Sequence, residues 1–453
     1  MTFAIKAGLV VCSCERALAD HAVIVEGDAV RAVLPNAELD GFVRAGGLDA
    51  ALVEDRRDCL LMPGLVNAHM HQYGVLSHGI PAAEGVTDFE GFLGDYWWPR
   101  VEDRIRQREV LTTSRATMAE MLRSGTTAFC DILEAPFCEA DTLVAQGEAI
   151  EVAGMRAVVS LESSERAGAE NGEACLGQNA DAARFFAARA AVRPEDPAAS
   201  LVRGAICTHT TFTCPEAMIA RAAGLARELG CLYQFHLCES RYERDWAAVH
   251  LGCTPVELYE RAGALGPATL AAQCVKLADG DLELLAESGV ATAHLPISNC
   301  EVGGGIAPVP DMLDRGMAPG LGTDGYVNDM FQVMRAAFLI HKAARETTDV
   351  MGAREVFRLA TECGAAAMGL ARVGRLEPGW KADVVAYRMG EQPTPINERN
   401  VYDQLVVFGR ASSVRDVWVA GRRLMGDGEL LTLDEERDAR ELRAVADEFW
   451  RGL

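Results

Sequence analysis

Several features of secreted and membrane proteins are missing from this chain of 453 residues. No apolar run reaches the length of a membrane span without a charge or a turn breaker. The first residues, Met-Thr-Phe-Ala-Ile-Lys, lack the basic region, apolar stretch and cleavage site of a signal peptide. The fourteen cysteines are spread singly, with no Cys-x-x-Cys pair. These absences predict a cytoplasmic protein with free, mostly buried thiols.

Positive charge is also scarce. The chain has 43 Lys and Arg against 66 Asp and Glu, a formal net charge of −23. Such an excess of negative charge opposes binding to nucleic acids and to anionic membranes. We therefore expect a small molecule as the partner, with neither nucleic acid nor membrane involved.

The chain is longer than one ordinary domain, and its residue patterns change twice. Residues 1–58 contain short alternating apolar stretches, which are typical of a small β-domain. Strand patterns return within residues 375–453, at 379–387 and 414–421, and are followed by a helix over about 434–450. We expect the two chain ends to form one small β-sandwich domain.

The middle segment, residues 59–374, alternates short apolar strands with longer amphipathic helices. Eight strands are predicted, and they end at His71, Ile132, Leu161, His209, His236, Cys274, His294 and Thr323. Helices are predicted between them, for example over 108–124, 215–229 and 281–288. This pattern predicts an α/β fold, a (β/α)₈ TIM-like barrel, whose chemistry belongs at the carboxyl ends of the strands.

The most informative stretch of the chain is Pro-Gly-Leu-Val-Asn-Ala-His-Met-His, residues 63–71. It follows an apolar run and reads as the end of a buried strand. Because side chains alternate along a strand, His69 and His71 point the same way while Met70 packs into the opposite layer. Two histidines at this spacing can bind one metal ion.

Other polar residues fall at the ends of later strands. They are His209 on the fourth strand, His236 and Glu239 on the fifth, His294 on the seventh and Asp324 on the eighth. Each alone is ordinary, because a single strand-end histidine is usually a hydrogen-bonded core residue and an aspartate in Gly-Thr-Asp-Gly usually forms a turn. Their clustering at one end of a barrel favours a metal site.

The residue types indicate the chemistry. Three imidazoles, of His69, His71 and His236, with the Asp324 carboxylate suit Zn²⁺, or Fe²⁺ as second choice, with room for water. A metal ion in such a site lowers the pKa of bound water toward neutrality. We expect Asp324 to accept the proton of that water and Glu239 to act as general acid and base. None of the four lysines lies on the first five predicted barrel strands, which excludes a carbamylated lysine bridging two metals.

A long segment follows the first barrel strand, over about residues 76–100. Glycine and proline alternate there with aromatic residues, including Trp97 and Trp98. Long loops on the catalytic face of a barrel usually bind ligand or exclude water. We predict a lid that contacts the substrate, and the alternative is that the aromatic side chains pack the start of a helix.

With these motifs in view, the chain resembles the amidohydrolase superfamily over nearly its whole length, in its single-metal cytosine/guanine deaminase and triazine hydrolase branch. The motifs that carry the resemblance are residues 63–71, Ser124-Gly-Thr-Thr, His236-x-x-Glu239, 306–313, 321–325 and 376–383. Within the branch the chain is most similar to SsnA-type aminohydrolases, through Trp97-Trp98 and residues 323–331, 393–395 and 408–414.

The resemblance implies roles for single residues. It implies that His69, His71, His236 and Asp324 are metal ligands, that Glu239 is the proton shuttle and that His209 reaches the substrate. Two positions depart from the family pattern. Gln273 stands where the family usually has a histidine, and it can exchange hydrogen bonds but cannot titrate. His78 stands where many relatives have arginine, so both departures affect the expected substrate more than the metal site.

These observations predict a metal-dependent hydrolase that most simply replaces an amino group on a purine, pterin, pyrimidine or triazine ring by oxygen. The same site could remove chloride, sulfide or a substituted amine, or open a cyclic amide. A different class is a family member that binds a ligand without turnover, toward which only Gln273 points. The predicted substrate contacts are His209, Gln273, His294 and Trp97, and the resemblance makes a homodimer plausible.

Overall fold

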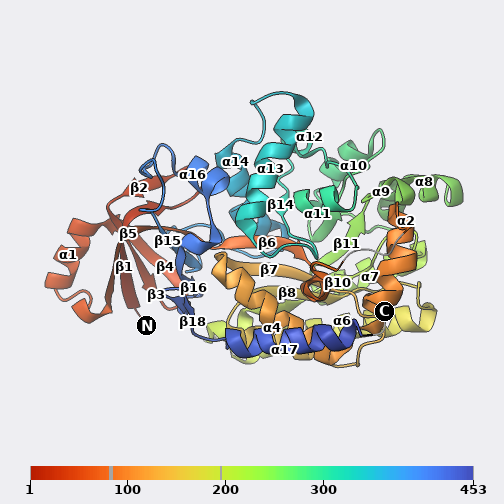
Figure 1. The fold of residues 1–453 in the computed structure, drawn as a ribbon, viewed down its shortest axis with the longest axis horizontal. Helices are drawn as coiled ribbons and strands as arrows, with labels where there is room; N and C mark the ends of the chain where they lie inside the picture. The colour runs from red at the N-terminus through yellow and green to blue at the C-terminus, as the bar shows by residue number, and fades with distance from the viewer. Residues whose placement is uncertain (1, 81–84, 194–195, 452–453) are drawn as a thin grey trace.

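The computed structural model describes residues 2–80, 85–193 and 196–451 of the chain. Two parallel sheets lie at the centre among helices, and a nine-stranded mixed sheet lies on one side (Figure 1). The amino terminus lies in the mixed sheet, whereas the carboxyl-terminal helix runs along the outside of the parallel part (Figure 1). The predicted combination of helices and strands in one α/β protein is confirmed.

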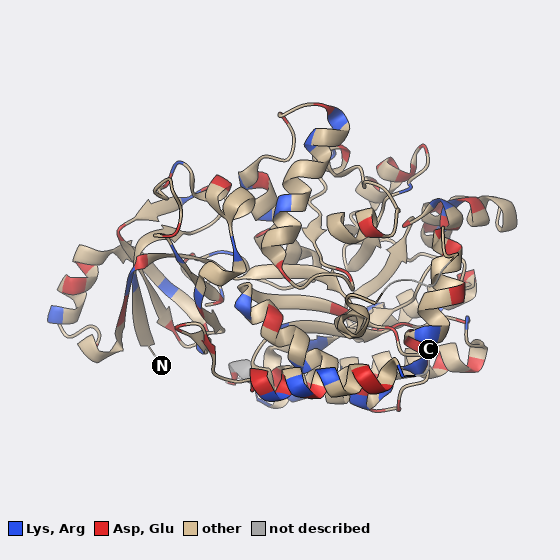
Figure 2. Ribbon diagram, viewed as in Figure 1, with Lys and Arg blue, Asp and Glu red and all other residues tan. Residues whose placement is uncertain are grey.

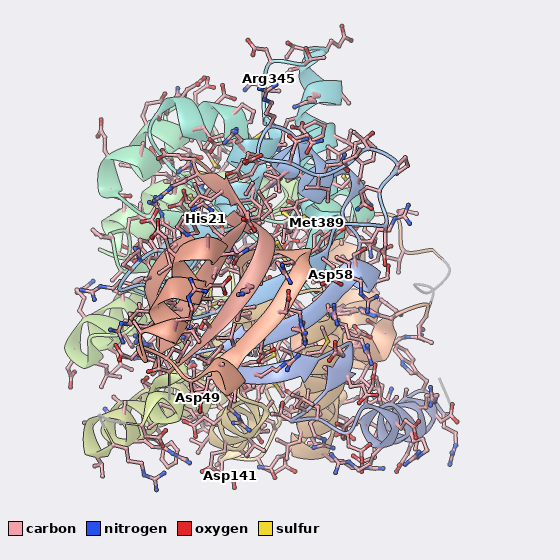
Figure 3. The ribbon with its side chains drawn as sticks, turned by 90° about the vertical axis from the view of Figure 1, so that its left-hand side faces the viewer. His21, Asp49, Asp58, Asp141, Arg345 and Met389 are labelled. Carbon is pink, nitrogen blue, oxygen red and sulfur yellow. The ribbon has the colours of Figure 1, made fainter. Side chains whose placement is uncertain are left out.

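The mixed sheet contains strands from both ends of the chain. Its strands are β1 (Thr2–Val11), β2 (Ala17–Ala19), β3 (His21–Glu26), β4 (Ala29–Pro35), β5 (Val53–Pro63), β15 (Val384–Arg388), β16 (Val414–Val419), β17 (Arg422–Gly426) and β18 (Glu429–Leu430). β5 pairs in parallel with β1 and antiparallel with β15, so the amino- and carboxyl-terminal strands become neighbours. Figure 3 shows this junction between Asp58 and Met389, where the Met389 N–H donates to the Asp58 carbonyl at 3.1 Å.

The two parallel sheets contain the strands of the middle segment. One consists of β6 (Leu65–Met70), β7 (Thr126–Leu133), β8 (Arg156–Leu161) and β9 (Val202–Gly204). The other consists of β10 (Ile206–Cys207), β11 (Tyr233–Leu237), β12 (Thr269–Gln273), β13 (Ala291–His294) and β14 (Gly320–Leu321). Nearly every residue of these strands is buried, as expected for parallel strands covered on both faces. Most observed strand ends lie within two residues of the predicted ones.

Two junctions connect these parallel sheets. The chain passes directly from β9 to β10 through Ala205, whose N–H donates to the Val159 carbonyl at 2.9 Å. The predicted fourth strand is therefore split at Ala205, where it changes partner from β8 to β11. On the opposite side, Met70 and Asp324 form a parallel bridge, which brings the end of β14 against the end of β6.

Helices connect the parallel strands and pack around them. They are α4 (Gln107–Arg123), α5 (Thr142–Ala153), α6 (Ala169–Val192), α7 (Glu216–Leu229), α8 (Arg241–His250), α9 (Pro255–Arg261), α10 (Asp281–Ser288), α11 (Pro296–Glu301), α12 (Val309–Asp314), α13 (Met330–Arg345), α14 (Ala353–Arg358) and α15 (Gly364–Ala367). The predicted helices over 108–124, 215–229 and 281–288 correspond to α4, α7 and α10. Short helical turns, among them α2 (Phe89–Gly91) and α3 (Trp98–Arg100), lie in the segment after β6.

The remaining helices belong to the chain ends. They are α1 (Asn36–Arg44), α16 (Val401–Phe408) and α17 (Glu435–Phe449). Charges of both signs alternate along α17, which lies beside α4 (Figure 2). One contact between them is the ion pair of Arg115 and Asp438, with 3.1 Å between Nε and Oδ1.

Two expectations from composition can be compared with the structure. All fourteen cysteines are free thiols and most are buried, as predicted. Along the described ranges, no helix has the length and apolar character that a bilayer crossing requires.

Candidate active site

β6 carries the first two predicted metal ligands. All six of its residues are buried, and the alternation of side chains separates His69 from Met70. Met70 belongs to the main hydrophobic core, whereas the rings of His69 and His71 lie edge to face with 4.9 Å between their centroids. The Asn67 side chain donates to Thr323 Oγ1 at 2.7 Å, which fixes the end of β6 against the segment that follows β14.

Three imidazoles meet at this point. The side chain of His236, from the end of β11, places its ring centroid 5.0 Å from that of His69 and 5.3 Å from that of His71. One ring nitrogen of each histidine lies within 4.8 Å of the others. His71 Nδ1 donates to the Ile132 carbonyl at 2.8 Å, which leaves its Nε2 turned toward the cluster.

A nitrogen at the centre of this cluster lacks a hydrogen-bond partner. Both ring nitrogens of His69 are buried and without such a partner, and His236 Nε2 faces His71 Nε2 at 3.4 Å. Buried polar atoms are nearly always paired, so atoms of this kind require a binding partner. Three converging imidazole nitrogens are the donor set that divalent transition metals prefer. The residues present therefore fit a metal ion.

Asp324 completes the cluster. It follows β14 in the left-handed backbone region, with a φ of 58°, and its Oδ1 lies 2.9 Å from His71 Nε2 and 3.5 Å from His69 Nε2. Its Oδ2 accepts hydrogen bonds from Ser298 Oγ at 2.6 Å and from Gln273 Nε2 at 3.0 Å. Burial alone would raise the pKa of Asp324, but the two imidazoles hold it well below its ordinary value. One carboxylate oxygen is thus held in place and the other faces the histidines.

A cavity of about 600 Å³ opens beside this cluster. Glu239, two residues beyond the end of β11, lines it together with His71, His236 and Asp324. Burial, followed by the nearby carboxylates of Asp324 and Glu243, raises the pKa of Glu239 well above its ordinary value. A carboxyl group with a raised pKa can hold a proton at neutral pH and donate it.

Gln273 is fixed by its neighbours. It ends β12 with a φ of 79°, and its carbonyl oxygen accepts a hydrogen bond from the Asn299 side chain. Because that oxygen is occupied, the amide nitrogen faces Asp324 and the cavity, which Gln273 also lines. The side chain that replaces the usual histidine therefore presents N–H donors to the site.

The predicted substrate contacts His209 and Trp97 both line the cavity. His209 Nδ1 lies 2.9 Å from Thr213 Oγ1, and burial lowers the pKa of His209 to about 4, so its imidazole is neutral. The Trp97 ring stacks on Phe92, and its Nε1 donates to Tyr73 Oη at 3.3 Å. Trp98 lies beside Trp97 in sequence but is not among the lining residues.

The structure does not bring every candidate to the cavity. Among the described residues that line it, His294 is absent. Its Nε2 lies 3.1 Å from the Nε2 of His341, on α13, and both side chains are buried. The predicted substrate contact of His294 therefore stays a prediction. His78, the second departure from the family pattern, lines the cavity, and its Nε2 lies 3.1 Å from the Gly325 carbonyl.

Three residues near the histidines were not predicted from the sequence. Glu102, Glu134 and Tyr73 are buried and line the cavity, and the Tyr73 hydroxyl donates to Glu134. Glu134 Oε2 lies 3.8 Å from His71 Nδ1. Burial, with the charge of Glu134, raises the pKa of Glu102 well above its ordinary value. Glu134 directly follows β7, so the rule that strand ends carry function could have found it.

Comparison with known proteins relates this site to a family. The Amidohydrolase family matches residues 60–424. The chain is 34% identical over 426 residues to the 5-methylthioadenosine/S-adenosylhomocysteine deaminase of Syntrophobacter fumaroxidans, covering 90% of this chain and 92% of that protein. It is 33% identical over 404 residues to the 5′-deoxyadenosine deaminase of Methanosarcina mazei, covering 88% of this chain and 89% of that protein.

A solved structure agrees with these matches. The crystal structure of an adenosine deaminase from Xanthomonas campestris with bound zinc has a TM-score of 0.85 to this chain, at 28% identity, and covers 99% of this chain and 98% of that one. The family match extends over most of the length, and both curated relatives exceed 30% identity over nearly the whole chain. The chain belongs to the amidohydrolase family.

Proposed function

We propose that this protein is a metal-dependent hydrolytic deaminase whose substrate is an amino-substituted nitrogen heterocycle of the adenosine type. One observation carries the proposal: one ring nitrogen each of His69, His71 and His236 converges with the Asp324 carboxylate beside a cavity that Glu239 lines. The deaminases named among the relatives favour a purine amino group over the pterin, pyrimidine and triazine alternatives.

The metal would be held by His69, His71, His236 and Asp324. Zinc is the first choice, because three imidazoles and one carboxylate suit it and because the Xanthomonas structure contains it, and iron is the second. A divalent cation in this position would supply Lewis acidity, which lowers the pKa of water toward neutrality. The Ile132 carbonyl, which accepts a hydrogen bond from His71 Nδ1, would hold the His71 ring in orientation for the metal.

Two side chains of this protein, those of Glu239 and Asp324, would carry out the proton transfers. Hydrolysis adds water to the ring carbon that carries the amino group and releases ammonia. Glu239 delivers a proton to the adjacent ring nitrogen, and it later helps to protonate the departing amine. Asp324 accepts the proton that water loses, and its Oδ2 is held by Ser298 and Gln273. The Gln273 amide donates a hydrogen bond to the substrate or to the attacking oxygen, while His209 and Trp97 orient the ring.

The metal site gives a direct prediction. The protein should carry one divalent ion per chain, and His69→Ala should weaken its affinity by more than about 100-fold, because one of three imidazole ligands is lost. Elemental analysis after dialysis against a chelator measures the occupancy. His250→Ala, which changes an exposed histidine at the end of α8, is the matched control and should keep the metal. Two ions per chain, or full occupancy in His69→Ala, would contradict the assignment.

The reaction class is tested with the zinc-loaded protein and a panel of adenosine-type nucleosides, pterins, pyrimidines and triazines. We expect ammonia release with the adenosine-type compounds. Release of chloride, sulfide or a substituted amine without ammonia would favour the alternative leaving groups, and opening of a cyclic amide would favour that alternative. Metal binding without turnover of any compound would favour a non-catalytic ligand-binding protein.

Trp97 provides a test of the lid. Trp97→Ala should raise KM by about tenfold, because the lining loses a large aromatic side chain that stacks on Phe92. Steady-state kinetics measure the effect, with an adenosine-type nucleoside that the wild-type protein deaminates as the substrate. Trp246→Ala, which removes a partly buried tryptophan outside the lining, is the matched control and should leave KM unchanged. An unchanged KM in folded variants of both Trp97 and Trp98 would contradict the lid.

We also propose that the two parallel sheets form one closed (β/α)₈ barrel. The passage from β9 to β10 through Ala205 and the bridge between Met70 and Asp324 support closure on both sides. A separate hydrophobic cluster, which unites β1 and β3 with Val384 and Trp418, supports a small β-sandwich built from both chain ends.

Three further expectations stay predictions. The first is the division into residues 1–58, 59–374 and 375–453, although β5 runs on to Pro63. The others are a cytoplasmic location and a homodimer, and size-exclusion chromatography with light scattering tests the homodimer.

A further inference from the structure

The cavity beside the histidines is lined by carboxylates and, among the described residues, by no lysine or arginine. The carboxylates belong to Glu102, Glu134, Glu239, Glu301 and Asp324. Residues 81–84, which lie outside the described ranges, are Pro-Ala-Ala-Glu and contain no cation either. The lining therefore offers carboxyl groups, and no lysine or arginine, to an anionic substrate group.

Arg166 lies next to the lining residue Glu102, with its side chain 7% exposed, and its charge is already paired. Its Nη2 donates to Glu102 and its Nη1 to Asp103, both at 2.7 Å. Its Nε lies 3.6 Å from Glu162, and its guanidinium lies 5.0 Å from the Trp98 ring centroid. With three acidic partners, Arg166 cannot also neutralise an anion inside the cavity.

The rest of the lining makes an anion still less favourable. Its apolar side chains include Ile80, Phe92, Leu93, Trp97, Val302 and Val327. Of the five carboxyl groups, that of Glu301, at the end of α11, belongs to an exposed residue. A phosphate placed here would lose water and meet no lysine or arginine among the described lining residues, which is unfavourable. An uncharged group would bury apolar surface, and a cation would meet carboxylates.

Resting on the proposed deaminase function, we infer that the cavity selects nucleosides by charge. It accepts substrates whose sugar carries an uncharged or cationic 5′ group, and it rejects those that carry a phosphate there. A phosphate is rejected because the lining gives it no counter-ion. Specificity of this kind disfavours the wrong substrate and needs no special contact with the accepted one.

The inference is tested with the zinc-loaded protein and four adenosine derivatives that differ only at the 5′ position. They are 5′-deoxyadenosine and 5′-methylthioadenosine, which are uncharged, 5′-amino-5′-deoxyadenosine, which is cationic, and adenosine 5′-monophosphate, which is anionic. We expect kcat/KM for the monophosphate to be at least about 100-fold below that for 5′-methylthioadenosine, the neutral compound with a bulky 5′ group. Rates within about tenfold of each other would overturn the inference and leave the deaminase function intact.

A charge reversal at the cavity locates the cause. Glu301→Lys should raise the kcat/KM ratio of the monophosphate to 5′-deoxyadenosine by about tenfold, and added salt should reduce this gain. Glu38→Lys makes the same charge change on α1, at the far end of the mixed sheet (Figure 1), and should leave the ratio unchanged. An unchanged ratio in Glu301→Lys, or an equal gain in Glu38→Lys, would overturn the inference.

Binding measurements test the selection by charge independently of the deamination reaction. Calorimetry with the Glu239→Gln variant should detect 5′-deoxyadenosine and not the monophosphate at equal concentration. If the wild type deaminates no compound, the proposed function fails. The binding preference still tests whether the cavity selects ligands by the charge of the 5′ group. Equal or tighter binding of the monophosphate overturns this selection.

Discussion

Replacing Glu239 by glutamine should lower kcat by about 10²–10⁴-fold while the metal stays bound. Glutamine keeps the size and polarity of the side chain but cannot deliver or take up a proton. Glu239 lines the cavity and lies outside the predicted ligand set, so its loss should affect proton transfer and not metal occupancy. Steady-state kinetics and elemental analysis of the same preparation measure both quantities.

The pKa of Glu239 strengthens this expectation. Burial and the neighbouring carboxylates raise it well above the ordinary glutamate value, so the protonated form that a general acid needs persists toward neutral pH. Glu228→Gln is the matched control, because Glu228 is an exposed glutamate on α7. The control should keep wild-type kcat. An active wild type and a Glu239→Gln variant with equal kcat would remove Glu239 from the mechanism.

The sequence was sufficient to predict the histidine cluster, for physical reasons. The period of two along β6 forces His69 and His71 onto one face. The carboxyl ends of parallel strands lie at one edge, so His236 and Asp324 could be expected beside them without knowing any long-range contact. The structure brings all four side chains together.

Other parts of the site depend on packing that no local pattern encodes. Gln273 presents its N–H groups only because Asn299, from α11, occupies its carbonyl oxygen. His294 ends its strand as predicted, but its ring meets His341 because α13 packs there. The pairing of β1 in parallel with β5 likewise joins segments that are about 50 residues apart, and sequence alternation alone does not specify it.

One motif of the sequence has a structural explanation outside the cavity. Asp383 ends the run over residues 376–383, and it lies just before β15 in the mixed sheet. Its carboxylate forms a two-pronged ion pair with Arg156, at the start of β8, with N–O distances of 2.9 and 3.0 Å. It also accepts the Ala420 N–H at 2.8 Å. Arg156 is 5% exposed and Asp383 2%, so this pair joins the mixed sheet to the parallel strands away from water.

Asp383→Ala should therefore lower the free energy of unfolding by about 3–5 kcal/mol, since it leaves the buried Arg156 charge without a partner. Urea denaturation of the metal-loaded protein, followed by circular dichroism, measures the change. Asp181→Ala removes an exposed partner, 3.4 Å from Arg184, and should change stability by less than about 1 kcal/mol. Replacing both residues, as Arg156→Met with Asp383→Leu, should recover part of the loss because no uncompensated charge remains buried. A loss below about 1 kcal/mol in Asp383→Ala would mean that Arg156 finds water or another acceptor when its partner is removed.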